Sequence, residues 1–319
     1  MQPVGKLMAE MEIIMDKVQE ELLEAVAGLH ETPKGAYNIR ANGKSVARGT
    51  TSQIDIKTRE TGDGINIHIH PGTKGETVYI PVVMDQAGLK EVVYNDFFIG
   101  EDADVTIVAG CGIHNCGASD SQHDGIHRFF LGKNSKVKYV ERHYGSGDGN
   151  GARIMNPKTI LELEEGSSMD MESVQIKGVD STIRVTTANV GKDAKLTVTE
   201  RLMTHGSQTA KSEFDVQLNG ADSSANIISR SVAKDHSHQV FQSRINGNAK
   251  CSGHSECDSI IMGDAKISAI PEITANNPDA ALIHEAAIGK IAGDQIIKLM
   301  TLGLTEAEAE EQIVNGFLK

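Results

Sequence analysis

The stretch Gly191-Lys-Asp-Ala-Lys-Leu196 joins one short apolar run to the next, and variants of it recur along the chain. The full motif has six positions: Gly, any residue, Asp or Asn, a small residue, any residue and an apolar residue. The other full copies are Gly100–Val105, Gly132–Val137 and Gly220–Ala225, and shorter versions are Glu165–Met169, Gly247–Cys251 and Gly263–Ile267. Aligned on their last residues, the copies are 32, 32, 27, 29, 26 and 16 residues apart. A repeat of about 30 residues predicts a β-solenoid of stacked coils. The irregular spacing leaves a β-sandwich or jelly roll open as the alternative.

The region between these copies has the period of β-strands. From about residue 36 to 275, apolar residues alternate with polar ones, as in Ile65-x-Ile67-x-Ile69 and Val78-x-Ile80-x-Val82. Gly, Asn and Asp punctuate these short runs, and no helical period is interleaved. The pattern therefore predicts a mainly β body and disfavours a doubly wound α/β fold.

Both ends of the chain have helical patterns. Within residues 1–35, apolar side chains recur at helical spacing, which predicts an amphipathic docking helix; they are Val4, Leu7, Met8, Met11, Met15, Val18, Leu22 and Val26. Near the other end, we expect a helix that starts at Gly293 with Asp294 as N-cap and stops at Gly303. Thr305-Glu-Ala-Glu308 is a capping-box sequence for a last helix ending near Gly316. The expected organisation is a helical segment at 1–35, a β core at 36–287 and a helical element at 288–319.

Composition excludes several classes of function. Asp and Glu number 44 against 31 Lys and Arg, a net charge of −13, which argues against a surface that tracks nucleic acid. No run of 18 apolar residues predicts a membrane span, and the first residues lack a signal-peptide pattern. We therefore expect a cytoplasmic protein with reduced cysteines. The sequence also has no Gly-x4-Gly-Lys-Ser/Thr phosphate loop, so we expect no nucleotide to bind to this chain.

All four cysteines lie in two short clusters with histidine. One is Cys111-Gly-Ile-His114-Asn-Cys116, and the other is Cys251-Ser-Gly-His254-Ser-Glu-Cys257. Thiols with imidazole suit zinc or iron–sulfur chemistry. Neither cluster has the tight C-x2-C spacing of a zinc knuckle, so buried unreactive cysteines remain the alternative to a metal or sulfur-handling site.

Five motifs in the last part of the chain resemble, in order and spacing, those of the SufB/SufD family of iron–sulfur cluster assembly scaffolds. They are Cys257-Asp-Ser-Ile-Ile-Met-Gly263, Ala281-Leu-Ile-His284-Glu285-Ala286, Gly289-Lys-Ile-Ala-Gly-Asp-Gln295, Leu302-Gly303-Leu304-Thr-Glu-Ala-Glu-Ala309 and Val314-Asn-Gly-Phe317. The resemblance covers roughly residues 36–319. The chain is shorter than a typical SufB, mostly in its N-terminal region, and is most similar to the SufB-like protein of minimal SUF-like systems.

The resemblance implies a right-handed parallel β-helix and an assembly scaffold rather than an enzyme. It implies a dimer, here of two copies of this chain, with a SufC-like ABC-type ATPase on each C-terminal helical element. A transient iron–sulfur cluster would form where the two β bodies meet and pass to apo iron–sulfur proteins, with sulfur from a separate donor.

The resemblance also implies roles for individual residues. Cys257 matches the cysteine of cluster assembly, and His284 and Glu285 match further proposed metal ligands. Cys111, Cys116 and Cys251 have no secure counterpart; they are candidates for sulfur relay, for extra ligands or for structural roles. The ATPase-contacting residues would be Gly303, Leu304, Gly316 and Phe317.

Two features keep other interpretations open. If 281–287 is a regular strand, then His284 and Glu285 point to opposite faces, and one of them would not ligate the cluster directly. The alternatives in function are a SufD-like structural partner without its own cluster site, or a zinc-binding β-solenoid enzyme. Cys257 argues against the first of these, because SufD-type proteins generally lack that cysteine.

Overall fold

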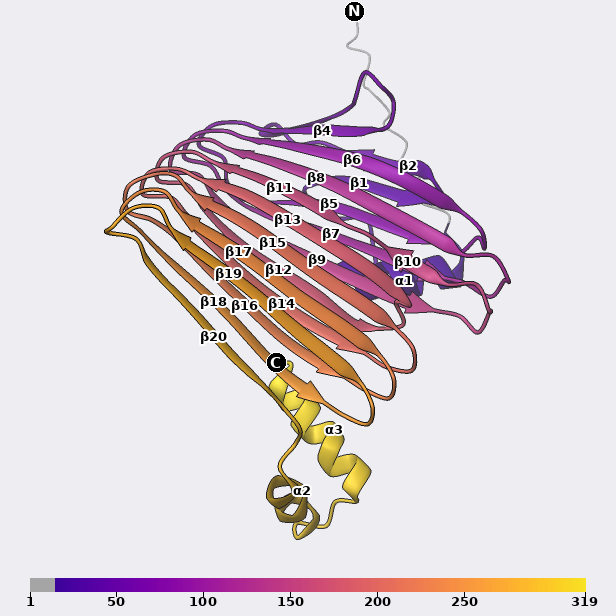
Figure 1. Ribbon diagram of the computed structural model, residues 1–319. Coiled ribbons are helices and arrows are strands. Elements are labelled where there is room, and N and C mark those ends of the chain that lie inside the picture. Colours follow the sequence, from indigo (N-terminus) through magenta and orange to yellow (C-terminus); the bar gives the residue numbers. More distant parts are fainter. Residues whose placement is uncertain (1–14) are drawn as a thin grey trace, which may run out of the picture.

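The computed structural model describes residues 15–319, and these residues form a β-solenoid with two flattened sheets (Figure 1). Positions 1–14 of the expected N-terminal helix lie outside the described residues. The first sheet contains, in spatial order, β2 (Lys44–Gly49), β1 (Ala36–Ala41), β5 (Lys74–Met84), β7 (Asp104–His114), β9 (Lys136–Ser146), β12 (Ser168–Lys177), β14 (Lys195–Thr204), β16 (Ser223–Ala233), β18 (Cys251–Ile261) and β20 (Ala281–Gly289). The second contains β19 (Lys266–Ala275), β17 (His238–Gly247), β15 (Thr209–Leu218), β13 (Ser181–Val190), β10 (Arg153–Met155), β8 (Ser121–Leu131), β6 (Lys90–Ile99), β4 (Gly64–Ile69) and β3 (Ile54–Thr58), with β11 (Lys158–Leu163) beside β8 and β13.

From β5 onward the chain alternates between the two sheets, so each coil contributes one strand to each, except that β10 and β11 together fill the place of one strand in the second sheet. Neighbouring coils pair in parallel, and the antiparallel pairs are confined to β1–β2 and β3–β4 at the first end. The predicted mainly β solenoid is therefore confirmed, and the sandwich alternative is wrong.

The sequence repeat corresponds to the register of the first sheet. Val105, Val137, Met169, Leu196 and Ala225 follow one another directly across β7, β9, β12, β14 and β16. The last two copies of the repeat depart from this row. Ala225 pairs with Gly253, two residues beyond Cys251, and Ile267 belongs to β19 of the other sheet.

The recurring phrase is a corner whose chemistry the backbone explains. Its third residue adopts the left-handed conformation, with φ of +57° at Asp102, +56° at Asp193 and +57° at Asp222. Asp and Asn tolerate this conformation better than other residues with a Cβ. The glycine is needed because coils meet closely there: a Cβ on Gly220 would lie 2.0 Å from the backbone nitrogen of Lys192 in the previous coil.

The inside of the solenoid holds the main core. Alternate residues of each strand point inward and form one apolar cluster that runs from the first coils to Cys251 and Cys257. Its largest side chains include Phe97 and Phe129, whose rings stack with centroids 4.4 Å apart. This core fixes the register, because a slip of one residue would turn every inward side chain to solvent.

Helix α1 (Lys17–Ala27) covers the outer face of the first sheet beside β5, β7 and β9. Asp16 caps its N-terminus by accepting from the backbone N–H of Gln19, and Gly28 ends it in the left-handed conformation. Leu22 and Val26 are buried against Gly110 and Gly112 of β7, where the absence of side chains lets the helix approach.

Two helices follow β20 and extend beyond the last coil (Figure 1). Helix α2 (Gly293–Met300) has Ala292 at its N-cap with no side-chain cap, so the predicted cap at Asp294 is wrong. Asp294 lies in the first turn, where its negative charge interacts favourably with the positive end of the helix dipole. Helix α3 (Glu306–Phe317) has the predicted capping box between Thr305 and Glu308. Val314 and Leu318 pack against Val232 on the outer face of the first sheet.

Candidate functional site

Cys257 lies on the inner face of β18, one coil before the end of the solenoid. Its side chain is buried, and its neighbour on β20 is the small residue Ala286. Burial raises the pKa of the thiol; the Ser259 hydroxyl, 3.6 Å away, opposes this, and the charges of Glu200 and Asp258 add to it. Cys257 is therefore a protonated thiol at neutral pH in this buried position.

His284 shares this inner face. It stands opposite Ser255 in the parallel pairing of β18 with β20, two residues along from the Cys257–Ala286 pair. Its Nδ1 is buried and has no hydrogen-bond partner among residues 15–319. A buried polar atom without a partner costs about 1–3 kcal/mol, so this nitrogen has an unsatisfied hydrogen-bonding or ligating capacity.

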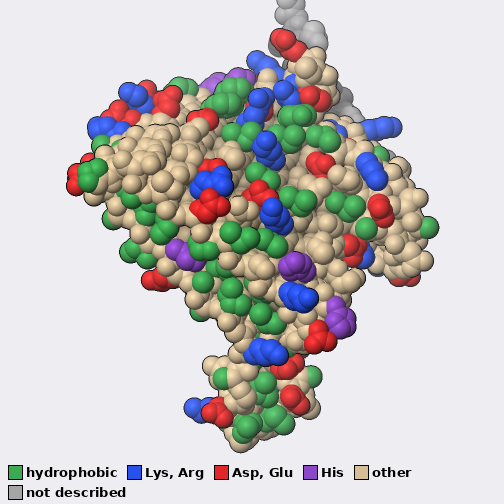
Figure 2. All heavy atoms as spheres, viewed as in Figure 1, with side chains coloured by type: hydrophobic (Ala, Val, Ile, Leu, Met, Phe, Trp, Pro, Cys, Tyr) green, Lys and Arg blue, Asp and Glu red, His purple; other side chains and the backbone are tan. Residues whose placement is uncertain are grey.

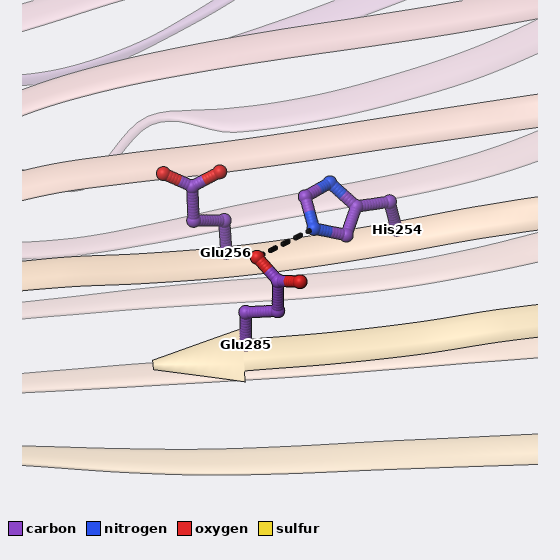
Figure 3. A group of neighbouring side chains, drawn as sticks. All are labelled: His254, Glu256 and Glu285. Atoms are coloured by element: carbon purple, nitrogen blue, oxygen red, sulfur yellow. Dashed lines mark ion pairs between the residues drawn. The ribbon is translucent and has the colours of Figure 1, made fainter. Parts of the chain in front are cut away.

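Glu285 points to the other face of the same strand. β20 is a regular strand, so consecutive side chains alternate. The register places Glu285 beside Glu256, and its Oε2 lies 3.6 Å from Nε2 of His254 (Figure 3). The structure thus brings Cys257 and His284 together on the inner face and separates Glu285 from them.

A line of buried polar residues leads through the solenoid to Cys257. Successive strands of the first sheet place Glu141, Ser173, Glu200, Ser229 and Cys257 in one inward-facing row, which we call the inner polar row. At about 4.8 Å per strand, its four steps span about 19 Å. The alternation of β9, which places the acid Glu141 at an inward position between buried residues, is the sequence signal for this row.

One arginine connects this row across the two sheets. Arg184 of β13 forms ion pairs with both Glu141 and Glu200, and all three side chains are buried. Glu200 in turn accepts hydrogen bonds from Ser229 at 2.8 Å and from Ser212 at 2.5 Å. Burial raises the pKa of Glu141, but the charges of Arg184 and then His143 outweigh it and hold this pKa well below its usual range.

Comparison with known proteins identifies the family. Residues 83–317 match the family described as SUF system FeS cluster assembly, SufBD core domain. The chain belongs to the SufBD family. A SufBD family iron–sulfur cluster assembly protein of Methanocaldococcus jannaschii is 30% identical over 94% of this chain and 98% of its own length. SufBD family proteins of Archaeoglobus fulgidus (31% identical over 82% of this chain and 69% of theirs) and Pyrococcus horikoshii (26%, 92% and 84%) are also similar.

In this SufBD protein the first cysteine cluster divides between the inside and the surface. Cys111 points inward from β7 and lines a small pocket with His123, His127, Glu141 and His143. Burial raises the pKa of the Cys111 thiol well above its usual range, and nearby carboxylates add to the effect. The pocket adjoins the first residue of the inner polar row.

Cys116 is exposed just beyond β7 and contacts a histidine. Its Sγ lies 3.0 Å from Nε2 of His114, and Nδ1 of His114 lies 2.9 Å from the hydroxyl of Ser146. With Nδ1 donating to that hydroxyl, Nε2 carries the lone pair that can take the thiol proton. Cys116 and His114 therefore have the geometry of a nucleophile and its base.

Cys251 is separated from Cys257 on the same strand. Both point inward, but six residues of extended chain place them about 20 Å apart. Burial raises the pKa of the Cys251 thiol. Cys251 thus belongs to the core rather than to the Cys257–His284 pair, and it offers a matched control for substitutions of Cys257.

The C-terminal helices of the SufBD protein carry apolar side chains into solvent. Ile297 and Leu302 are 61% and 78% exposed. Gly303 and Leu304 lie in the connection between α2 and α3, Gly316 is exposed on α3, and Phe317 packs against the β body. On the face shown in Figure 2, Lys and Arg side chains are interspersed with Asp and Glu, so no single-sign surface forms there.

Among residues 15–319, no helix is long and apolar enough to cross a membrane.

Proposed function

We propose that this SufBD protein is a scaffold that builds a nascent iron–sulfur cluster at the junction of two copies of the chain and transfers it to apo-proteins in the cytoplasm. The observation that carries the proposal is that Cys257 of β18 and His284 of the neighbouring strand β20 share the inner face at the end of the solenoid. One thiol and one imidazole are too few ligands for a cluster, whereas two copies supply four. A site of this mixed composition holds its product loosely, as a scaffold must.

The open end of the solenoid supports the choice of a second copy as the partner. β19 and β20 are the last strands of their sheets, so each presents an edge without a further strand in the described chain. Ile270, Ile273, Ile283 and Ile288 are each at least 39% exposed on these two strands. Apolar edge strands of this kind favour association, and a two-fold interface would bring Cys257 and His284 of both copies together.

A separate SufC-like ABC-type ATPase would bind α2, whose apolar side chains face solvent. Gly303 and Leu304 follow α2 in the chain and would contact the ATPase with it, and Gly316 would extend the contact to the far end of α3, where Phe317 would support it from the side of the β body. ATP binding to that partner would then strain the scaffold junction. This division of labour leaves the chain itself without enzymatic activity.

The first cysteine cluster supports an entry point for sulfur. We propose that the thiol of Cys116, deprotonated by His114, attacks the outer sulfur of a donor persulfide, so that a persulfide forms on Cys116 and the donor thiol is released. Onward transfer would need a thiol at each step, since the serine and glutamate side chains of the inner polar row cannot hold this sulfur; a small carrier thiol would supply the step to Cys257. Cys251 lies off this row and would be structural.

Anaerobic reconstitution with iron and sulfide tests the proposal. The wild-type chain should acquire a labile cluster, followed by visible absorption and Mössbauer spectra, and Cys257→Ser should not. Cys251→Ser is the matched control, since it removes another buried inward thiol of β18, and should retain the cluster. Equal cluster yields in wild type and Cys257→Ser would contradict the scaffold function.

A SufD-like structural partner is the second candidate, and the burial of Cys257 favours it. A thiol that is 1% exposed in the closed chain cannot react unless the last coil opens. Native-state alkylation separates the two functions. Modification of Cys257 that accelerates when the ATPase partner and ATP are added supports the scaffold, whereas a thiol that stays protected while the wild type builds no cluster supports the structural role.

A further inference from the structure

The outer face of the last coil holds a second group of metal-binding side chains. His254 and Glu256 of β18 and Glu285 of β20 each offer a ligand atom, and these atoms lie within 4.8 Å of one another (Figure 3). A first-row metal ion binds nitrogen and oxygen at about 2.1 Å, which requires ligand atoms about 3 Å apart. Nε2 of His254 and Oε2 of Glu285 are already 3.6 Å apart, so side-chain rotations of this size would complete the geometry.

The orientation of His254 is fixed by a separate contact. Its Nδ1 lies 2.8 Å from Oδ1 of Asn226, its direct neighbour on β16. Nδ1 therefore donates its proton to the amide oxygen, and the lone pair of Nε2 points toward Glu285. Histidine ligands of metal ions typically hold their second nitrogen in this way, which fixes the tautomer and raises the basicity of the ligating atom.

The charges around the group also favour a cation. Glu256 lies beside Asp258 on the same face of β18, and burial followed by this second carboxyl raises the pKa of Glu256. Arg230 on β16 partly offsets the negative charge, as does His254 when protonated. Glu256 and Glu285 nevertheless place two carboxyl groups near one imidazole, with Asp258 beyond Glu256, and a divalent cation would relieve the repulsion between the carboxylates.

We propose that His254, Glu256 and Glu285 form a binding site for a divalent first-row metal ion on the outer face of β18 and β20. One imidazole and two carboxylates suit Fe²⁺, Mn²⁺ and Zn²⁺. Three protein ligands leave coordination positions open for water, so the ion can also be released. That the ion is ferrous iron rests on the proposed scaffold function. Glu285 and His284 are consecutive residues on opposite faces of β20. The stored ion would therefore lie on the outer face of the same strand whose inner face carries the assembly site.

Manganese binding to the full-length chain tests the site without any cluster chemistry. We expect anaerobic titration with Mn²⁺, followed by electron paramagnetic resonance, to show one bound ion per chain, with the electron-spin-echo coupling of one histidine nitrogen. His254→Gln should abolish that coupling and weaken binding at least about tenfold. Asn226→Ala should weaken binding about 10- to 100-fold, because it removes the partner that orients the imidazole.

Two control variants make the result specific. His236→Gln disrupts an exposed histidine–carboxylate pair of similar length, 3.7 Å from His236 Nδ1 to Asp264 Oδ2, which has no third ligand within residues 15–319, and should leave Mn²⁺ binding unchanged. Cys257→Ser should also leave it unchanged while abolishing the cluster. Absence of Mn²⁺ binding, absence of a histidine coupling in the wild type, or unchanged binding in both His254→Gln and Glu285→Gln would overturn the proposal. If the metal site fails these tests but the cluster assembles normally, the scaffold function is retained and only the metal site is rejected. If Mn²⁺ binds but no cluster assembles, the metal site is retained and the scaffold function is rejected.

Discussion

Replacing Arg184 with methionine should destabilise the protein by about 3–5 kcal/mol. Methionine keeps most of the volume but removes the charge that faces Glu141 and Glu200. Arg184 is 3% exposed, and the two carboxylates are 3% and 4% exposed, so neither can turn to solvent without opening the core. Removal of one partner from a buried ion pair typically costs about 3–5 kcal/mol, because the remaining charge is left uncompensated. This is a large share of the about 5–15 kcal/mol that stabilises a native domain.

The assay is urea unfolding followed by far-ultraviolet circular dichroism at pH 7.5. Arg201→Met is the matched control, since Arg201 pairs with Glu172 on the outer face, where the side chains are 22% and 31% exposed. An exposed pair contributes about 0–1 kcal/mol, so the control should unfold near the wild-type midpoint. A loss of less than about 1 kcal/mol in Arg184→Met would refute the reasoning that the inner polar row depends on this charge.

The same variant should show an altered pH dependence. In the wild type, the pKa of Glu141 is held well below its ordinary 4.5, so its contribution to stability is present above that value and is lost as the pH falls through the folded-state pKa. Without Arg184, burial and the charge of Glu200 would raise the folded-state pKa above 4.5. The deficit of the variant should therefore shrink as the pH falls from 7.5 to 5. A deficit that grows over this range would contradict the assignment.

Three further predictions concern the corners, the surface thiol and the exposed helix. Gly220→Ala should lower the free energy of unfolding by about 1–3 kcal/mol, because its Cβ would overlap the previous coil, whereas Gly289→Ala, with no atom within 4 Å, should not; equal urea midpoints would contradict this. Iodoacetamide should modify Cys116 in the native protein before any other thiol, and His114→Gln should slow this modification at least about tenfold at pH 7. The rates are measured by mass spectrometry of tryptic peptides, and equal rates in both proteins would show that His114 does not activate Cys116. Ile297→Glu should abolish co-purification of the ATPase partner without changing the thermal unfolding of the chain, and an intact complex would place the docking surface elsewhere.

The corners of the solenoid could be predicted from sequence because their chemistry is local. Asp102 and Asp193 follow a glycine at fixed distance and adopt the left-handed conformation that this pattern favours. The repeat located five positions of one inward row correctly. It missed Cys251 by two residues because the last coils vary the length of the connection, which no local pattern reveals.

The candidate site could be predicted only in part, for a geometric reason. Alternation along β20 correctly warned that His284 and Glu285 face opposite sides. The partnership of Glu141 and Arg184 joins strands of different sheets, and sequence alternation gives the face of a side chain but not what lies across the core. The contact of His254 with Asn226 depends on the register between β16 and β18, which the spacing of the repeat left uncertain by two residues.

Native mass spectrometry of the anaerobically reconstituted chain tests the central claim most directly. If Cys257 and His284 of two copies hold the cluster together, then the cluster should occur only in dimers, at one per two chains, and the monomer should be free of iron and sulfide. Monomers that carry a cluster, or dimers that carry two, would contradict assembly at the junction.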